Sequence, residues 1–283
     1  MKILVLGASG MAGHTIAIYM QEKQHQVVSF TRKPFPYTNN IVGDVKDINL
    51  LKIIIEEGCY DVVINCIGIL NKNAEDNQSD AVFLNSFLPH YLVQITKGTT
   101  TKIIHMSTDC VFSGKKGLYM ENSFKDGETF YDRSKALGEI NDTKNLTFRN
   151  SIIGPDMNKD GIGLFNWFMK QKGTIKGYNK AIWTGVTTLT LARAMEQAIY
   201  EDLTGLYHLV NNKYINKFEL LNLFNRYFKS NSIHIIKDES ICIDKSLINL
   251  RGDFLFEVPS YEEMIADMQE WIMSHKHLYP HYE

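Results

Sequence analysis

Tyr131 and Lys135 are separated by four positions in the segment Tyr-Asp-Arg-Ser-Lys. On a helix, residues four positions apart lie on one face, so the phenol and the ammonium would be neighbours. A phenol has an ordinary pKa of about 10, and it exchanges protons efficiently near neutral pH only when a nearby cation stabilises its phenolate. The pair therefore predicts an acid-base site in which Lys135 lowers the pKa of Tyr131. The same spacing occurs on solvated helix faces, so other motifs must support this prediction.

The N-terminal residues predict a strand over 2–6, a glycine-rich turn and a helix that begins near Met11. In such a turn, Gly7 allows a tight bend, Gly10 lets the backbone approach a pyrophosphate and Gly13 permits close packing of the helix on the strand. The free N–H groups and the dipole at the start of the helix favour an anion. The motif therefore predicts a dinucleotide-binding turn, with a plain strand-to-helix turn as the alternative.

A third motif, Ser-Thr-Asp-Cys-Val-Phe at 107–112, follows a predicted strand. With the glycine-rich turn and the segment Tyr-Asp-Arg-Ser-Lys-Ala-Leu-Gly-Glu at 131–139, it resembles the extended short-chain dehydrogenase/reductase superfamily. The likeness is closest to dTDP-4-dehydrorhamnose reductases, whose patterns are STDYVF and YGxSKxxGE, and it is clear over 1–155. The resemblance implies a Rossmann-type α/β fold, a doubly wound parallel sheet with a smaller mixed α/β C-terminal substrate lobe. It makes the catalytic set Thr108, Tyr131 and Lys135.

The resemblance also implies where a cofactor would bind. The contacts come from the glycine-rich turn, the loops after the next strands and the catalytic helix. They are Gly7, Ser9, Gly10, Met11, Ala12, Arg32, Asp44, Val45, Cys66, Ile67, Gly68, Asn85, Tyr131 and Lys135. Cys66 and Ile67 are bulkier than the alanines usual in the family, and Gly68 would allow a close approach to the cofactor.

Cofactor choice depends on the residue that follows the second strand, predicted over 26–31. An acidic side chain there would bind the 2′-hydroxyl of an adenosine ribose, whereas a cation suits a 2′-phosphate. This chain has Arg32 with Lys33 beside it, which favours NADPH, with NADH as the second candidate. The alternative is that both residues belong to a basic surface loop.

Two of the cofactor residues have a second interpretation. Asp44 would hold adenine, or it would cap the N-terminus of a helix predicted over 46–57. Asn85 would bend its helix and support a proton relay through water, as in the superfamily, or it would have no such role.

The resemblance places a nucleotide-sugar substrate beyond the catalytic residues. Asp109 would face the sugar, and Cys110 would line the pocket where the family usually has tyrosine. Asn166 would contact the diphosphate or base, with a surface position on a core helix as the alternative. Trp183 would stack on the base or fill the core. His105 is expected to be a packed or hydrogen-bonded core residue rather than an acid or base.

Strands and helices alternate along the chain, the pattern of a parallel sheet covered on both faces. Further strands are predicted over 61–65, 102–106, 146–153 and 206–210, and further helices over 189–200, 217–228 and 260–274. Residues 1–155 would form the cofactor domain, to which 183–210 return. Residues 156–182 and 211–283 would form the substrate lobe.

The composition excludes several classes of protein. The 283 residues carry a formal net charge of −2, without the basic field that nucleic acid requires. No apolar run approaches the length of a membrane span, and the four cysteines lack a C-x-x-C pair, so reduced thiols in the cytoplasm are expected. No histidine spacing fits a zinc motif, and no metal is predicted. The superfamily implies a homodimer.

The function that the resemblance implies is NADPH-dependent reduction of a nucleotide-linked 4-keto-6-deoxyhexose, in deoxysugar and polysaccharide biosynthesis. Tyr131 would protonate the carbonyl oxygen while Thr108 stabilises the developing alkoxide. Lys135 would lower the pKa of Tyr131 and hydrogen-bond the nicotinamide ribose.

Four alternatives stay open at this point. One is a reductase of a UDP-linked 2-acetamido-4-keto sugar. Another is an NAD-dependent sugar-nucleotide epimerase, which Arg32 disfavours. A dehydratase is disfavoured because Asp109-Cys110 lacks the acidic pair typical of that class. The fourth is a non-catalytic, NADP-binding regulatory subunit, as known for methionine adenosyltransferase.

Overall fold

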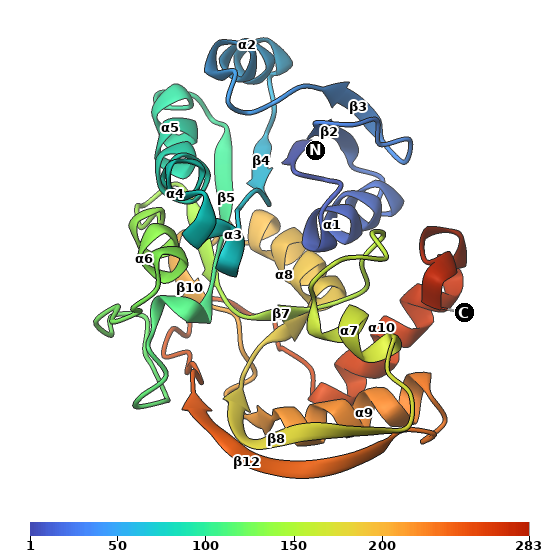
Figure 1. The fold of residues 1–283 in the computed structure, drawn as a ribbon. Coiled ribbons are helices and arrows are strands. Elements are labelled where there is room, and N and C mark those ends of the chain that lie inside the picture. Colours follow the sequence, from blue (N-terminus) through green and yellow to red (C-terminus); the bar gives the residue numbers. More distant parts are fainter. Residues whose placement is uncertain (283) are drawn as a thin grey trace.

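The computed structural model describes residues 1–282 as two layers of structure, a large sheet flanked by helices and a smaller lobe beneath it (Figure 1). The large sheet has seven strands in the order β10-β6-β5-β4-β1-β2-β3, and neighbouring strands are parallel. Its strands are β1 (Lys2–Leu6), β2 (Gln26–Thr31), β3 (Asn39–Val42), β4 (Val62–Asn65), β5 (Lys102–Ser107), β6 (Leu146–Arg149) and β10 (Gly205–His208). The fold class predicted from the sequence is confirmed.

Helices cover both faces of this sheet because its strands are apolar on both sides. One face packs against α1 (Met11–Glu22) and α8 (Thr188–Tyr200). The other packs against α2 (Ile48–Gly58) and α5 (Leu88–Ile95), with α6 (Phe130–Leu137) further along. The strand order reverses between β1 and β4, so the crevice outside the ends of these strands is where such a fold binds ligands.

A run of short helices connects β4 to α5. It comprises α3 (Asn71–Asp76), α4 (Gln78–Ala81) and a π-helical segment, η1 (Val82–Phe87). The 3₁₀ turn η2 (Asp109–Val111) follows β5.

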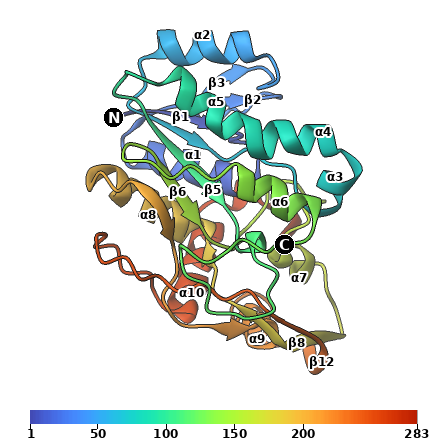
Figure 2. The ribbon, with the colours of Figure 1, turned by 90° about the vertical axis from the view of Figure 1, so that its left-hand side faces the viewer.

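The lower lobe contains a three-stranded sheet, β11-β8-β12, seen beneath the large sheet in both ribbon views (Figure 2). Its strands are β8 (Thr174–Trp183), β11 (Ile215–Asn216) and β12 (His234–Asp244), and β7 (Ile152–Ile153) pairs separately with β9 (Val186–Thr187). Its helices are α7 (Leu164–Met169), α9 (Lys217–Phe228) and α10 (Tyr261–Ser274). The 3₁₀ turns η3 (Lys276–Leu278) and η4 (Pro280–Tyr282) follow.

The C-terminal segment returns to the first helix. His14 Nε2 lies 2.7 Å from the hydroxyl oxygen of Tyr279, and Trp271 Nε1 donates to the same oxygen at 3.0 Å. Leu278 and Tyr279 belong to the apolar cluster between the sheet and α1. Residues beyond 270 therefore stabilise the first layer as well as the lobe.

One predicted strand was wrong, and one strand was missed. The strand predicted over 146–153 is interrupted, because the chain leaves the large sheet after Arg149 and the carbonyl of Ser151 instead accepts a hydrogen bond from Val186. The strand β12 was not predicted at all, since it is mostly exposed and pairs in parallel with β8, far from it in sequence. Among the described residues, no helix is long and apolar enough to cross a membrane.

Candidate active site

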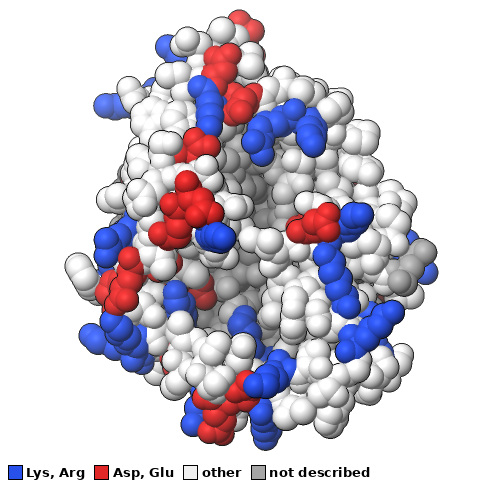
Figure 3. Space-filling model, in the orientation of Figure 1, with Lys and Arg blue, Asp and Glu red and all other residues white. Residues whose placement is uncertain are grey.

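A pocket of about 550 Å³ opens at the ends of β1, β2 and β4, where the strand order reverses. Figure 3 shows the molecule hollowed near the centre of this face, with acidic and basic side chains interspersed around the hollow. The wall of the 550 Å³ pocket includes nine of the predicted cofactor residues: Gly7, Ser9, Gly10, Arg32, Asp44, Val45, Cys66, Ile67 and Gly68. Met11, Ala12, Asn85, Tyr131 and Lys135 are not part of this wall.

The glycine-rich turn adopts the geometry that its sequence predicts. Gly7 has φ +79°, a left-handed conformation that favours glycine. A Cβ on Gly13 would lie 2.2 Å from the carbonyl oxygen of Gly7, so only glycine lets α1 pack this closely on the turn. Gly10 is the N-cap of α1 and supplies no side-chain cap. The first N–H groups of α1 therefore lie beside the pocket without a capping side chain, as an anion site needs.

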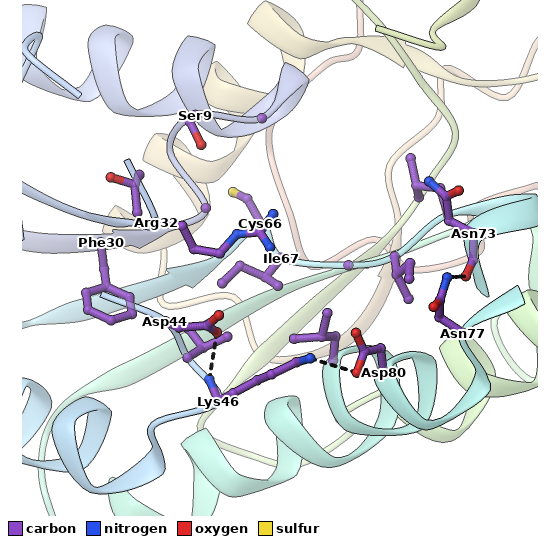
Figure 4. A pocket seen from close by; sticks show the side chains of 18 of the residues that line it. Ser9, Phe30, Arg32, Asp44, Lys46, Cys66, Ile67, Asn73, Asn77 and Asp80 are labelled. Atoms are coloured by element: carbon purple, nitrogen blue, oxygen red, sulfur yellow. Dashed lines mark hydrogen bonds and ion pairs between the residues drawn. The ribbon is translucent and has the colours of Figure 1, made fainter. Parts of the chain in front are cut away.

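Arg32 and Asp44 follow the neighbouring strands β2 and β3, and both line the pocket (Figure 4). Asp44 Oδ1 accepts a hydrogen bond from the backbone N–H of Lys46 at 3.0 Å. The N-cap of α2 is Asp47, whose carboxylate accepts from Leu50 N at 3.0 Å. The alternative in which Asp44 caps this helix is therefore wrong, and its side chain faces the pocket.

Lys46 also reaches across the pocket mouth. Its Nζ lies 2.7 Å from Asp80 Oδ1 on α4, and both side chains belong to the pocket wall (Figure 4). The sequence did not indicate this pair, because the two residues come from different elements.

Asn85 ties the loop after β4 to the catalytic helix. Its Oδ1 accepts from Ile69 N at 3.0 Å, and its Nδ2 donates to Ile69 O and to Ser134 Oγ, each at 3.0 Å. Asn85 is fully buried in the π-helical segment, and both ends of its amide have protein partners. A Cβ on Gly68 would lie 3.2 Å from its Oδ1, so this glycine allows the loop to approach.

Tyr131 and Lys135 lie on α6, which begins with a capping box. Thr129 Oγ1 accepts from Asp132 N, and the Asp132 carboxylate accepts from Thr129 N, both at 3.1 Å. The helix buries both functional side chains, which are 6% and 5% exposed. Tyr131 packs against Cys110, in the turn that follows β5. The structure thus brings Tyr131 against the turn η2, whose N-cap is Thr108.

The expected acidification of Tyr131 is not found. Burial raises the pKa of Tyr131, the charges of Cys110 and Asp109 add to the rise, and the nearby Thr108 hydroxyl opposes it only in part. Lys135 Nζ donates to the carbonyl oxygen of Met106 at 2.6 Å, so its cation is directed at the end of β5. Burial also lowers the pKa of Lys135, to about 8.

The residues after Thr108 form the other wall of the catalytic site. Thr108 Oγ1 accepts from Cys110 N at 3.1 Å and donates to Asp109 Oδ1 at 3.2 Å. Burial raises the pKa of Asp109, while Lys245 and Lys217 oppose the rise. Burial raises the pKa of Cys110 to about 12, so the thiol is neutral, and it packs against Tyr131.

Lys217 is a candidate site residue that the sequence analysis missed. It is the first residue of α9, its side chain is half-buried, and its Nζ lies 4.9 Å from the ring centre of Trp183. Burial lowers its pKa to about 8, with Asp109 and Cys110 opposing. No ion pair of the described residues includes Lys217. The capping box Asn216–Glu219 predicts the helix start, but no local signal places Lys217 near Asp109.

The two remaining substrate candidates lie in the interior. Asn166 is fully buried, and its Nδ2 donates to the carbonyl oxygens of Asn158, Lys159 and Gly161, so it holds the loop before α7. Trp183 is 3% exposed and packs against Tyr261 in the lobe core. The surface position considered for Asn166 is therefore wrong, and for Trp183 the structure supports the interpretation that it fills the core. Trp183 Nε1 is buried without a hydrogen-bond partner among the described residues.

Comparisons with known proteins give three findings. Residues 1–240 match the family model of the RmlD substrate binding domain. A dTDP-4-dehydrorhamnose reductase of Burkholderia thailandensis is 28% identical over 75% of this chain and 73% of its own length. The methionine adenosyltransferase 2 subunit beta of Xenopus tropicalis is 23% identical over 85% of this chain and 76% of its own.

Solved structures share the fold. The structure of dTDP-4-dehydrorhamnose reductase from Bacillus anthracis in complex with NADP matches 97% of this chain and 99% of its own, with a TM-score of 0.80 and 20% identity.

Proposed function

Because the chain belongs to the RmlD substrate binding domain family, we propose that it reduces the keto group of a nucleotide-linked 4-keto-6-deoxyhexose with NADPH, in deoxysugar and polysaccharide biosynthesis. The observation that carries this proposal is that α6 packs Tyr131 against the turn η2, which Thr108 caps, and directs Lys135 Nζ at the end of β5. A dTDP-4-dehydrorhamnose reductase is among its relatives. The substrate is accordingly a dTDP-linked sugar.

The described residues fit a dinucleotide. A Cβ on Gly7 would lie 2.8 Å from Ile67 Cγ1, so glycine lets this turn pack against the loop after β4, and Gly10 leaves the first N–H groups of α1 without a side-chain cap. Arg32 would bind the 2′-phosphate of NADPH, Asp44 the adenosine, and Cys66 to Gly68 the nicotinamide half. NADPH would supply the hydride when bound.

Tyr131 and Thr108 would act on the carbonyl oxygen. With substrate bound, the Thr108 hydroxyl, which here donates to Asp109 Oδ1, and the Tyr131 hydroxyl would each donate to the substrate oxygen. Tyr131 would transfer its proton to this oxygen, and Thr108 would stabilise the charge that develops there. Burial of both side chains keeps water from competing for these hydrogen bonds.

Lys135 would bind the nicotinamide ribose and replenish the proton of Tyr131. The pKa of the buried Tyr131 phenol is high, so its phenolate needs a stabilising cation during proton transfer. We propose that the Lys135 ammonium supplies this stabilisation once the cofactor is bound. Lys217 would face the anionic nucleotide, because its ammonium lies near Asp109 and has no carboxylate ion pair among the described residues.

We further propose that 1–155 with 183–210 serve the cofactor and that 156–182 with 211–283 serve the substrate. A cytoplasmic location and a homodimer stay predictions. Sedimentation of the purified protein measures the oligomeric state.

The direct test follows NADPH absorbance with dTDP-, UDP- and GDP-linked 4-keto-6-deoxy sugars as separate substrates. Oxidation that is fastest with the dTDP series supports the proposal. If NADPH is oxidised only with a UDP-linked 2-acetamido-4-keto sugar, the protein is instead a reductase of that sugar class. An epimerase would interconvert sugars without net oxidation of NADPH.

The likeness to a methionine adenosyltransferase subunit makes one further outcome informative. Cofactor binding without turnover in any sugar series would favour a regulatory subunit over an enzyme. The intact set Thr108, Tyr131 and Lys135 favours catalysis.

The choice of cofactor gives a separate prediction. Replacing Arg32 with alanine should weaken NADPH binding about 10- to 100-fold, because a charge-assisted hydrogen bond to phosphate contributes about 1.5–3 kcal/mol. NADH lacks the 2′-phosphate, so its affinity should change little. Titration of protein fluorescence with each cofactor measures both effects.

Lys33→Ala is the matched control, because Lys33 is the adjacent exposed cation but does not line the pocket. Equal losses of NADPH affinity in both variants would argue for a diffuse basic loop instead of a phosphate contact by Arg32.

A further inference from the structure

A line of buried polar side chains reaches Lys135 from the centre of the sheet. Asn65 ends β4 and lies directly opposite His105 on β5, and both side chains are fully buried. Asn65 Nδ2 is 3.2 Å from His105 Nδ1, and His105 Nε2 is 3.4 Å from Lys135 Nζ. His105 therefore lies between a fixed amide and the catalytic lysine.

The partners of Asn65 assign its amide orientation. The backbone N–H of Ile67 donates to Asn65 Oδ1 at 3.1 Å, and a backbone N–H can only donate. The oxygen of the amide must face Ile67, so its NH₂ group faces His105. An amide NH₂ also only donates, and His105 Nδ1 must accept. In a neutral imidazole the ring proton then resides on Nε2, the nitrogen nearest Lys135.

This tautomer directs an N–H group at Lys135. An ammonium group can only donate hydrogen bonds. A neutral amine also has a lone pair, which can accept a hydrogen bond from the Nε2–H group. Lys135 Nζ already donates to the carbonyl of Met106 at 2.6 Å. The neutral amine satisfies both contacts, while the ammonium would meet the Nε2–H group donor to donor.

Four other ionisable groups face or adjoin this contact. Burial lowers the pKa of Lys135 to about 8, and Glu139 and Cys66 oppose this change. Burial, Lys135 and His90 hold the pKa of His105 well below its usual value, so the ring is neutral. Tyr131 shares the helix face, and its raised pKa keeps the phenol protonated. The carboxylate of Glu139 accepts hydrogen bonds from Arg149 and Ser107. On β5, the side-chain group that faces Lys135 Nζ is therefore the Nε2–H group of His105.

We propose that Asn65 and Ile67 lock His105 in the Nε2–H tautomer, and that His105 is thereby a positioning residue that makes Lys135 a readier proton donor to Tyr131. This inference rests on the proposed function for its catalytic consequence. Tyr131 gives one proton to the substrate oxygen, and Lys135 returns one proton to the tyrosinate. The neutral amine of Lys135 then accepts a hydrogen bond from the Nε2–H group of His105 until a proton from solvent restores the ammonium.

The tautomer can be measured without any substrate. Two-bond ¹⁵N–¹H correlation spectra of the full-length protein, labelled on histidine, distinguish a proton on Nε2 from one on Nδ1. The spectrum of His105, assigned by its loss in His105→Phe, should show a neutral ring protonated on Nε2. A ring protonated on Nδ1, or a charged ring, would overturn the proposal.

The consequence for Lys135 is tested by Asn65→Asp, a change of nearly equal shape. One carboxylate oxygen keeps the Ile67 bond, and the other accepts from Nδ1, so the ring proton moves away from Nε2. Titration of Lys135 by ¹³C NMR of labelled lysine should then move upward by about one pH unit or more. The alkaline limb of the pH profile for kcat should move in parallel, with KM nearly unchanged.

The same substitution in a His105→Phe background separates the tautomer from the added charge. The upward shift should be smaller there, because no ring N–H can change its position. A shift of equal size in both backgrounds, or none with His105 present in a folded protein, would contradict the role of His105. If no sugar is reduced, the proposed function fails, while the histidine and lysine spectra still decide this inference.

Discussion

Replacing Tyr131 with phenylalanine is expected to lower kcat for sugar reduction about 10²- to 10⁴-fold, the usual contribution of a positioned acid. Phenylalanine fills the space of the buried ring beside Ala74 and Ala81, so only the hydroxyl is lost. Thr108 would still hydrogen-bond the substrate oxygen but would have no partner to transfer a proton. Because Tyr131 does not line the cofactor pocket wall, the Kd for NADPH should change little.

Stopped-flow or steady-state NADPH oxidation measures the loss of turnover, and fluorescence titration measures cofactor affinity. Tyr60→Phe is the matched control, since Tyr60 is also a buried tyrosine but lies before β4, at the other end of the strand from the pocket. This control should keep full activity. Full turnover by Tyr131→Phe would require another proton donor and would refute the acid role of Tyr131.

The parts of the fold that could be predicted from the sequence are those that local signals determine. The strand β1 and the start of α1 agree with the prediction because Gly7, with its positive φ, and Gly13, with no room for a Cβ, mark a strand-to-helix turn that only glycine fits. Helix α9 has the predicted bounds because the capping box at Asn216 specifies its start. Strand β12 carried no such signal, since its residues are mostly exposed and its pairing with β8 is long-range.

The candidate site shows the same division. The sequence identified Tyr131, Lys135 and Thr108, because each belongs to a motif with a recognisable spacing. It did not indicate that Lys135 contacts Met106 and His105, since that requires knowing how α6 lies on β5. Lys217 was missed for the same reason. Contacts between elements far apart in sequence decide the electrostatics of the site.

A buried ion pair beside the catalytic strand should dominate the stability of this region. Arg149 at the end of β6 binds Glu139 through Nε and Nη2, at 2.7 and 2.6 Å, and both side chains are 2% exposed. Ser107 Oγ donates to Glu139 Oε1 at 2.6 Å, which holds the residue next to Thr108. His208 Nε2 lies 2.8 Å from Arg149, and burial lowers the pKa of His208 to about 3, so the ring is neutral.

Glu139→Ala should therefore lower the free energy of unfolding by about 3–5 kcal/mol, because it leaves a buried guanidinium without its counter-charge. Urea unfolding followed by circular dichroism measures the loss. Glu56→Ala is the control, since Glu56 pairs with Lys52 on the exposed face of α2 and its loss should have a small effect. A Glu139→Ala loss no larger than that of the control would mean that Arg149 is solvated in the variant.

The same pair sets the response of stability to acid. Burial raises the pKa of Glu139, but hydrogen bonds and charge from Arg149, with Ser107 and Lys125, outweigh burial and hold it below its usual value. The folded state thus releases this proton more readily than the unfolded state, whose glutamate titrates near pH of about 4.3. The stabilisation is complete above that pH and is lost as pH falls through the folded pKa. Unfolding measured from neutral to acid pH should show this loss in the native protein and not in Glu139→Gln, which has no carboxyl group to titrate at this position.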